Sequence, residues 1–322
     1  MDPVFFIRTL FVTGTATLIL IFAIPAFRKR FFSYGARGTN TAQKQDHDHD
    51  HPNQRSTSVH QENAARTIEW FLDHLATYNV PHAWFLHFYV FSVALSLFWA
   101  YQITTQGYLF ATLTYWTHDK NSHMTSEQTL IIWWCLLIQG CRRLAECLRG
   151  PSSTSRMWIG HWFVGIGFYV LVNIAIWLEG CKSLLNDHPT YYNFLQAPVN
   201  ILNIVNAQLA VGLSVFLIGA VAQNRAHAYL WYLRTTGTYS FPEHPLFSLT
   251  LTPHYFSECA EYLGLAIAAA PRGQYVNKTI AAALTFVVVN LGITANGTYE
   301  WYAARFGQEK VKGKARMVPL IW

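Results

Sequence analysis

The chain has 322 residues, of which 12% are charged, 52% hydrophobic and 16% aromatic. A soluble chain of this length usually carries about 25% charged residues, so this one has too few to cover a globular surface. The formal net charge of +6 can indicate nucleic-acid binding, but here the basic residues stand between apolar runs, which favours a membrane protein. The composition therefore argues against a soluble enzyme and against a nucleic-acid partner.

The apolar stretches predict an all-α polytopic membrane protein with about seven transmembrane helices. The uncharged run Thr9–Phe27 has the length of a span and is followed by three basic residues, with no small-residue cleavage site before them. It therefore predicts a retained first anchor in residues 1–30 and not a signal peptide. The other spans are predicted at 84–105, 128–146, 157–178, 199–222, 258–271 and 279–299.

The third and sixth predicted spans reach sufficient length only when charged residues are included. These residues are Arg142 to Glu146 in one span and Glu258 and Glu261 in the other. Charged groups at membrane depth are costly and usually face a cavity. The two short spans therefore mark the place where a polar chamber is expected.

The basic residues are distributed unequally between the two sides of the membrane. With seven spans, the connections after spans one, three, five and seven carry 18 of the 23 Lys and Arg residues. The positive-inside rule then predicts a lumenal N-terminus and a cytosolic C-terminus.

Residues 31–80 are predicted to form a polar, disordered cytosolic loop, before a six-helix domain at 81–322. The tract Asp46–His51 alternates Asp and His and could hold a metal ion loosely, but nothing around it forms a closed site. The five cysteines form no CxxC pair and are interpreted as packing residues. We therefore predict no metal site.

Two polar clusters at predicted cytosolic helix ends could carry chemistry. His87 follows an aromatic run at the start of span two, where an interior hydrogen-bonded histidine is the more common interpretation. Arg143 and Glu146 are three residues apart, so they share a helix face and can pair. The alternative for the arginines is an ordinary positive-inside anchor.

Two further clusters follow along the chain. Gln223, His227 and Arg234 fall on one helical stripe, which suits a phosphate-bearing ligand; a snorkelling interfacial helix explains the stripe equally well. Glu258 and Glu261 share a face at the head of span six, where a carboxylate can accept ribose hydroxyls.

Taken in order, these clusters resemble the steroid 5α-reductase family, and within it the polyprenol (polyprenal) reductase branch. The resemblance covers roughly residues 80–322. It rests on AWFLHFY at 83–89, RRLAECL at 142–148, QxxxHxxLxxLR at 223–234, YSFP and LFSLTLTPHYFSE within 239–258, NLGITANGTYEWYAARF at 290–306 and KARMVPLIW at 314–322.

The resemblance implies an NADPH-dependent reductase of carbon–carbon double bonds conjugated to a carbonyl. The substrate pair Gln-Glu of the steroid enzymes falls on His87-Phe88, so a steroid-type site is not preserved. By position it implies cofactor-binding residues Gln223, His227, Arg234, Tyr239, His254 and Glu258, and catalytic candidates His87, Arg143, Glu146 and Tyr302.

The function implied is reduction of polyprenal to dolichal in dolichol biosynthesis, which supports protein N-glycosylation, in the endoplasmic reticulum membrane. The partners implied are a long-chain isoprenoid and membrane lipid, with no obligate protein partner. Alternatives are a trans-2-enoyl-CoA reductase of fatty-acid elongation, against which the absent ubiquitin-like domain counts, and a non-enzymatic seven-span receptor or transporter. Pro242-Glu243-His244, where the family has a Pro-x-Gly turn, is a departure.

Overall fold

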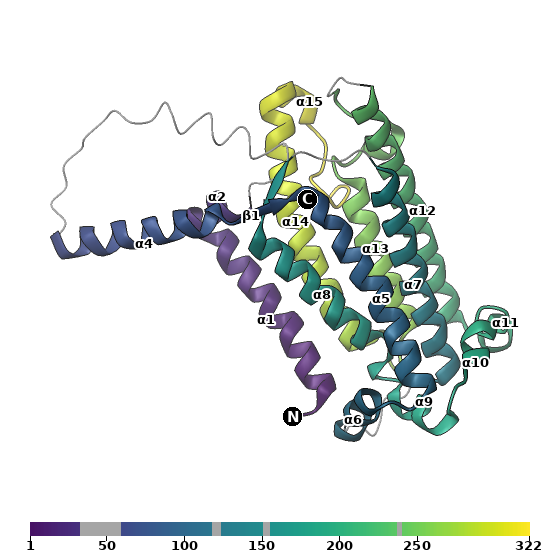
Figure 1. Ribbon diagram of the computed structural model, residues 1–322. Helices are drawn as coiled ribbons and strands as arrows, with labels where there is room; N and C mark the ends of the chain where they lie inside the picture. Colours follow the sequence, from purple (N-terminus) through teal and green to yellow (C-terminus); the bar gives the residue numbers. More distant parts are fainter. Residues whose placement is uncertain (33–58, 118–123, 151–154, 237–239) are drawn as a thin grey trace.

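The computed structural model describes residues 1–32, 59–117, 124–150, 155–236 and 240–322. In this part of the chain, long helices pack side by side into one bundle (Figure 1). The longer helices are α1 (Pro3–Ala23), α4 (Val59–Thr77), α5 (Phe85–Thr104), α7 (Ser126–Arg149), α8 (Ile159–Leu178), α12 (Ala207–Thr235), α13 (Pro253–Ala268) and α14 (Lys278–Phe306).

Short helices and two strands connect the long helices. The short helices are α2 (Pro25–Phe31), η2 (His82–Trp84), α6 (Tyr108–Trp116), α9 (Cys181–Asp187), α10 (Tyr191–Gln196), α11 (Ile201–Ile204), η3 (Pro245–Phe247) and α15 (Gln308–Val311). Two strands, β1 (Asn79–Pro81) and β2 (Arg156–Trp158), pair in antiparallel register, with Val80 opposite Met157. This pair ties the chain ahead of α5 to the start of α8.

Five helical segments of the described chain are long and apolar enough to cross a membrane: Pro3–Ala23, His82–Thr104, Ile159–Leu178, Ala207–Thr235 and Lys278–Phe306. The prediction of an all-helical polytopic membrane protein is confirmed at this level. Helices α7 and α13 complete the bundle, but α7 carries several charges in its last two turns and α13 has only 16 residues. The count of seven and the orientation of the termini stay predictions.

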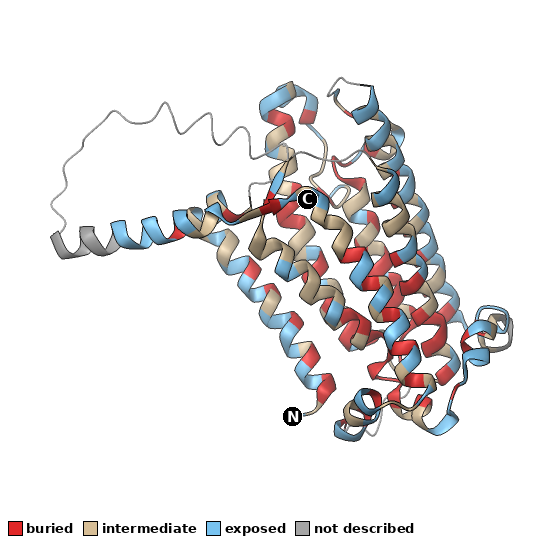
Figure 2. Cartoon of the chain, viewed as in Figure 1, coloured by how far each residue is buried: buried red, intermediate tan, exposed pale blue. Residues whose placement is uncertain are grey.

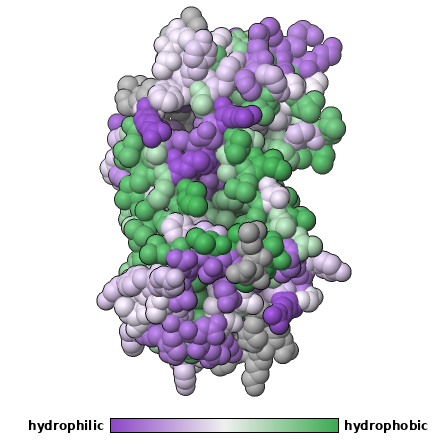
Figure 3. All heavy atoms as spheres, turned by 90° about the vertical axis from the view of Figure 1, so that its right-hand side faces the viewer, coloured by the Kyte–Doolittle hydropathy of each residue, from purple (hydrophilic) through white to green (hydrophobic). Residues whose placement is uncertain are grey.

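Side-chain exposure agrees with a lipid environment. Large apolar side chains such as Leu217 and Ile218 of α12 are exposed on the outside of the bundle, and Figure 2 shows exposed residues along the outer helix faces. In Figure 3 a hydrophobic belt lies between more hydrophilic ends. A soluble protein rarely exposes so large an apolar surface.

Two helix boundaries differ from the predicted spans, and a local sequence feature explains each one. The first helix ends at Ala23, because Ile24 is extended ahead of Pro25, as residues before proline tend to be. The span predicted at 199–222 begins at Ala207, where Asn206 caps α12 by accepting a hydrogen bond from the backbone N–H of Leu209 at 2.8 Å. Uncharged residues ahead of it form the short helices α10 and α11.

The predicted disordered loop at 31–80 is only partly tested. Residues 59–77 form the helix α4 and 79–81 form β1, so the loop prediction was wrong for this portion. The polar tract does contain a helical apolar period from 68 to 75, which tertiary contacts at its C-terminal end support. The Asp46–His51 tract lies outside the described residues.

Helices α12 and α13 pack with their backbones in close contact. A Cβ atom built on Gly212 would lie 2.4 Å from the backbone nitrogen of Ala268, and one on Gly264 would lie 2.5 Å from that of Phe216. Small residues allow such close helix packing in membranes. The contact holds the polar end of α13 against the last turns of α12.

Candidate active site

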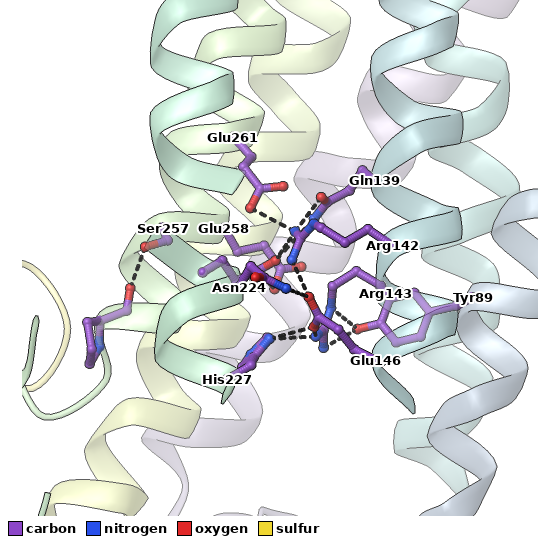
Figure 4. A network of polar contacts seen from close by, with 12 residues as sticks. Tyr89, Gln139, Arg142, Arg143, Glu146, Asn224, His227, Ser257, Glu258 and Glu261 are labelled. Atoms are coloured by element: carbon purple, nitrogen blue, oxygen red, sulfur yellow. Dashed lines mark hydrogen bonds and ion pairs between the residues drawn. The ribbon is translucent and has the colours of Figure 1, made fainter. Parts of the chain in front are cut away.

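Four helices contribute polar side chains from the same end of the bundle. The residues lie near the start of α5 and α13 and near the end of α7 and α12, where Figure 4 shows them converging. At a rise of 1.5 Å per residue, Arg142 is about 10 Å and Gln223 about 18 Å from the ends of their helices. The cluster is therefore inside the bundle and not on its rim.

Glu146 is the central acceptor of this cluster. It is paired with both Arg142 and Arg143 on its own helix, the former contact measuring 2.6 Å. From α12, Asn224 donates to Glu146 at 2.8 Å and the Nδ1 atom of His227 lies 2.9 Å from its Oε2 atom. One carboxylate thus joins the two helices.

Arg143 connects this carboxylate to α5. Its Nε and Nη2 atoms donate to the hydroxyl of Tyr89 at 3.1 and 2.8 Å, and its guanidinium lies 4.8 Å from the ring centroid of Tyr89. Its Nη1 atom is also 2.6 Å from Nδ1 of His227. A guanidinium with several fixed partners holds its donors in one geometry.

Arg142 turns the other way, toward α13. Its Nη2 atom donates to Oε1 of Gln139 and of Gln223, each at 2.5 Å, and lies 3.4 Å from Oε1 of Glu261. Gln223 then donates to Glu258 at 3.1 Å. The network therefore runs without a break from α5 through α7 and α12 to α13.

The network contains buried polar groups whose hydrogen-bonding capacity is not used up within the described chain. Gln223 and Glu261 are 0% and 1% exposed, and Oε2 of Glu261 and Nδ1 of His254 are buried without a hydrogen-bond partner in the described chain. Buried polar groups are normally satisfied. Acceptors without partners in a charged cluster are available to a ligand.

The structure brings most predicted site residues together. Arg143, Glu146, Gln223, His227 and Glu258 all belong to the network. The predicted pairing of Arg143 with Glu146 is confirmed, and His254 places its ring 5.3 Å from that of His227.

Other predicted site residues lie elsewhere. His87 packs among aromatic rings, 5.2 Å from Trp84 and 6.0 Å from Trp162 between centroids. Tyr302 lies in an aromatic cluster with Phe241 and other neighbours. Arg234 is exposed two turns beyond His227, and Tyr239 lies outside the described residues.

Sequence reasoning assigned no role to three members of the network: Tyr89, Gln139 and Asn224. Gln139 lies three residues before Arg142, so the helical period could have placed it on the same face. Asn224 stands beside the predicted Gln223. Tyr89 ends the motif AWFLHFY that carries the resemblance, but its contact with Arg143 gave no signal because the two residues are 54 positions apart.

The surface outside α7 and α12 has a polar interruption. Figure 3 turns this side of the bundle to the viewer, and hydrophilic atoms reach into the upper part of the hydrophobic belt around a hollow. A polar opening at membrane depth marks a pathway or cavity more often than a lipid contact. Polar atoms thus interrupt the apolar surface on this side of the bundle.

Comparison with known proteins identifies the class of this site. The family model described as 3-oxo-5-alpha-steroid 4-dehydrogenase matches residues 157–322, slightly more than half of the chain. The chain belongs to this family. The matched region contains α8, α12, α13 and α14, whereas Tyr89 and Arg143 lie before it.

The individual relatives are similar to this chain at low sequence identity. An uncharacterised protein of Schizosaccharomyces pombe is 27% identical over 191 residues, covering 59% of this chain and 62% of the relative. Polyprenal reductase 2 of Arabidopsis thaliana is 28% identical over 175 residues, covering 48% and 50%. The polyprenal reductase of Saccharomyces cerevisiae is 27% identical over 256 residues, 78% of each chain. The first two matches thus span half to three-fifths of the relatives' length.

The family assignment confirms the predicted resemblance and the enzyme class. The matching family is described as 3-oxo-5-alpha-steroid 4-dehydrogenase, and several relatives are named polyprenal reductases. Reductases of this family use a nicotinamide cofactor in general. The interpretation as a seven-span receptor or transporter without enzyme activity is set aside.

Proposed function

We propose that this protein reduces the α,β double bond of polyprenal to give dolichal, with NADPH as the hydride donor. The observation that carries the proposal is the charged network of α5, α7, α12 and α13 inside an apolar bundle, which suits a polar headgroup on a lipid tail. Several relatives named polyprenal reductases support this substrate. The step would belong to dolichol biosynthesis in the endoplasmic reticulum, in support of protein N-glycosylation.

The proposed topology places the network near the cytosol. Seven spans, with α7 and α13 as the third and sixth, put the C-terminus and most basic connections on the cytosolic side. The cofactor then enters from the same end of the bundle as the network. A long isoprenoid tail stays in the lipid while its aldehyde enters from the side.

The polar side chains of the network fit a nicotinamide dinucleotide. Glu258 and Glu261 offer carboxylate oxygens to ribose or carboxamide donors, and Oε2 of Glu261 has no partner in the described chain. Arg234, exposed at the end of α12, suits a phosphate group. When bound, the cofactor supplies a hydride. Gln223, His227 and His254 complete the proposed cofactor contacts.

Reduction of the double bond requires a carbonyl that can take up charge. Hydride adds to the β carbon only if the electrons can move to the carbonyl oxygen as an enolate, and an allylic alcohol has no such acceptor. Preorganised donors at the developing oxyanion lower the barrier. This chemistry makes the aldehyde, and not the alcohol, the expected substrate.

Tyr89 and Arg143 are placed to act at that oxygen. The hydroxyl of Tyr89 accepts two hydrogen bonds from Arg143, so its own proton points to a different acceptor. Donation of this proton to the enolate oxygen would leave a phenolate whose charge the guanidinium stabilises. The enol formed in this way becomes dolichal when Cα gains a proton and the oxygen loses its own. Glu146 holds Arg143 in place. His87 and Tyr302 remain proposed alternatives for the proton donor.

The test is NADPH consumption by membranes that contain the protein. Polyprenal, polyprenol, a trans-2-enoyl-CoA and a 3-keto-4-ene steroid are supplied separately, with Arg143→Ala membranes as the control. We expect oxidation of NADPH with polyprenal alone and formation of dolichal. Turnover of the enoyl-CoA without polyprenal turnover would support the alternative reductase and overturn the proposal.

A second measurement separates His87 from the network. His87→Ala should abolish turnover and spare NADPH binding if His87 is the donor. Its position among Trp84 and Trp162 leads us to expect a larger effect on KM for polyprenal than on NADPH binding. Unchanged turnover would remove His87 from the mechanism.

A further inference from the structure

Helix α4 stands apart from the bundle. In Figure 1 it runs across the direction of α1, at the end where α1 and α2 finish, and its N-terminal part projects away from the other helices. Its apolar residues Ile68, Phe71, Leu72 and Leu75 are separated by three or four positions, so they share one helix face. The opposite face carries Arg66 and Asp73, together with Trp70, which is 67% exposed.

The C-terminal half of α4 contacts the rest of the protein. Leu72 is buried, Asp73 accepts a hydrogen bond from Nε of Arg30 at 2.5 Å, and the backbone oxygen of Leu75 accepts one from Trp158 at 2.9 Å. One turn earlier, Ile68 and Phe71 are 59% and 52% exposed. Two large apolar side chains on a single face are therefore left uncovered by the described chain.

The contact with α2 fixes the level of α4 relative to the membrane. Helix α1 is a candidate span, and the basic triplet Arg28-Lys29-Arg30 lies in α2, which follows it. Basic residues at the end of a span lie at the lipid headgroups. Because Arg30 is bonded to Asp73, α4 lies at this same level.

We infer that α4 is an interfacial helix that rests on the bilayer surface, with Ile68 and Phe71 inserted among the lipid chains. An amphipathic helix lying in the plane of the interface buries its apolar face at the boundary of headgroups and acyl chains. The adjacent cations Arg28 and Lys29 suit lipid phosphates. The proposed occupant is lipid because α4 lies at the end of the candidate span α1, beside the basic triplet that marks the headgroup level.

This role does not depend on the substrate of the enzyme. Through β1, which follows α4 and pairs with β2, the helix connects the membrane surface to the starts of α5 and α8. A helix anchored in the interface would keep these two starts at a fixed depth. The sites of contact with lipid can be mapped without any activity measurement.

The experiment places a photoactivatable benzophenone amino acid in the full chain at position 68 or 71, and at 66 or 69 as controls on the opposite face. The proteins are reconstituted in vesicles of phosphatidylcholine and phosphatidylserine that carry a radiolabelled lipid. We expect about fivefold more lipid adduct at 68 and 71 than at 66 and 69, because only the first pair faces the acyl chains.

Two results would overturn the inference. Equal lipid labelling at all four positions would show that α4 does not present one face to the bilayer. Adducts at 68 and 71 with twice the mass of the chain would identify a second copy as the occupant of this face. Thermal unfolding of each variant in detergent verifies that it is folded.

Discussion

The described part of the bundle has ion clusters at its two opposite ends, and they are built differently. At the end opposite the network, Arg8 of α1 donates to Oε1 of Glu179 at 2.9 Å. The same oxygen accepts the backbone N–H and the hydroxyl of Thr279 at 3.0 and 2.5 Å. This cluster joins the starts of α1 and α14 to the end of α8.

Partner number, and not an unmet acceptor, separates the two ends. Each has one carboxylate oxygen without a partner in the described chain, on Glu179 and on Glu261. Glu179 lies at the N-terminus of α14, whose dipole favours a carboxylate. In the network, by contrast, Glu146 binds four side chains from two helices. We therefore consider the first cluster a helix connection and the second the candidate site.

The largest expected effect is on catalysis and comes from Arg143→Lys. Lysine keeps the positive charge but cannot bind Tyr89, Glu146 and His227 together. We expect single-turnover hydride transfer from NADPH to slow by about 10²–10³-fold, as for removal of an oxyanion donor.

Arg8→Lys is the matched control at the opposite end. It makes the same change in a cluster that we consider structural, so hydride transfer should stay within about twofold while the thermal midpoint in detergent falls. Equal losses of activity in the two variants would contradict the division of the molecule into a structural end and a catalytic end.

Tyr89→Phe should have the next largest effect. It removes one oxygen and leaves the ring packed against Tyr169, 5.8 Å away. We expect hydride transfer to slow by about 10²-fold, the usual loss when a general acid is removed, with unchanged NADPH binding by fluorescence titration. Full activity in this variant would show that Arg143 acts on the substrate without Tyr89.

Much of this comparison could be predicted from sequence. The lengths of the apolar stretches predicted the long helices. The charged residues Arg142–Glu146 and Glu258–Glu261, which interrupt two of these stretches, predicted the location of the site. Helical spacing also gave the pair Arg143 and Glu146, because that contact is local. Contacts between helices had no such signal, so the meeting of Tyr89 with Arg143 and of Arg8 with Glu179 became visible only in the structure.

A smaller effect is expected from the contact between α12 and α13. Gly264→Ala places a methyl group against the backbone of Phe216, which should cost about 1–3 kcal/mol as overpacking and shift Glu258 and Glu261. We expect a lower thermal midpoint and a lower affinity for NADPH in a binding titration. Gly167→Ala on α8 is the control, because a Cβ there meets nothing within 4 Å. A stable, fully active Gly264→Ala protein would show that this close contact does not position the network.

The smallest effect is expected at the structural end, from Thr279→Val. The change keeps the shape of the side chain but removes the hydroxyl that donates to Glu179 and accepts from Nε of Arg8 at 2.9 Å. The backbone N–H of Thr279 still binds Glu179, so we expect a loss of about 1 kcal/mol in detergent unfolding and no change in hydride transfer. Thr285→Val, on the exposed side of α14, is the matched control because its hydroxyl bonds only to the backbone of its own helix, at Ala281. A fall in turnover for Thr279→Val alone would mean that the two ends of the bundle are coupled through α14, and that the structural end also helps to set the geometry of the site.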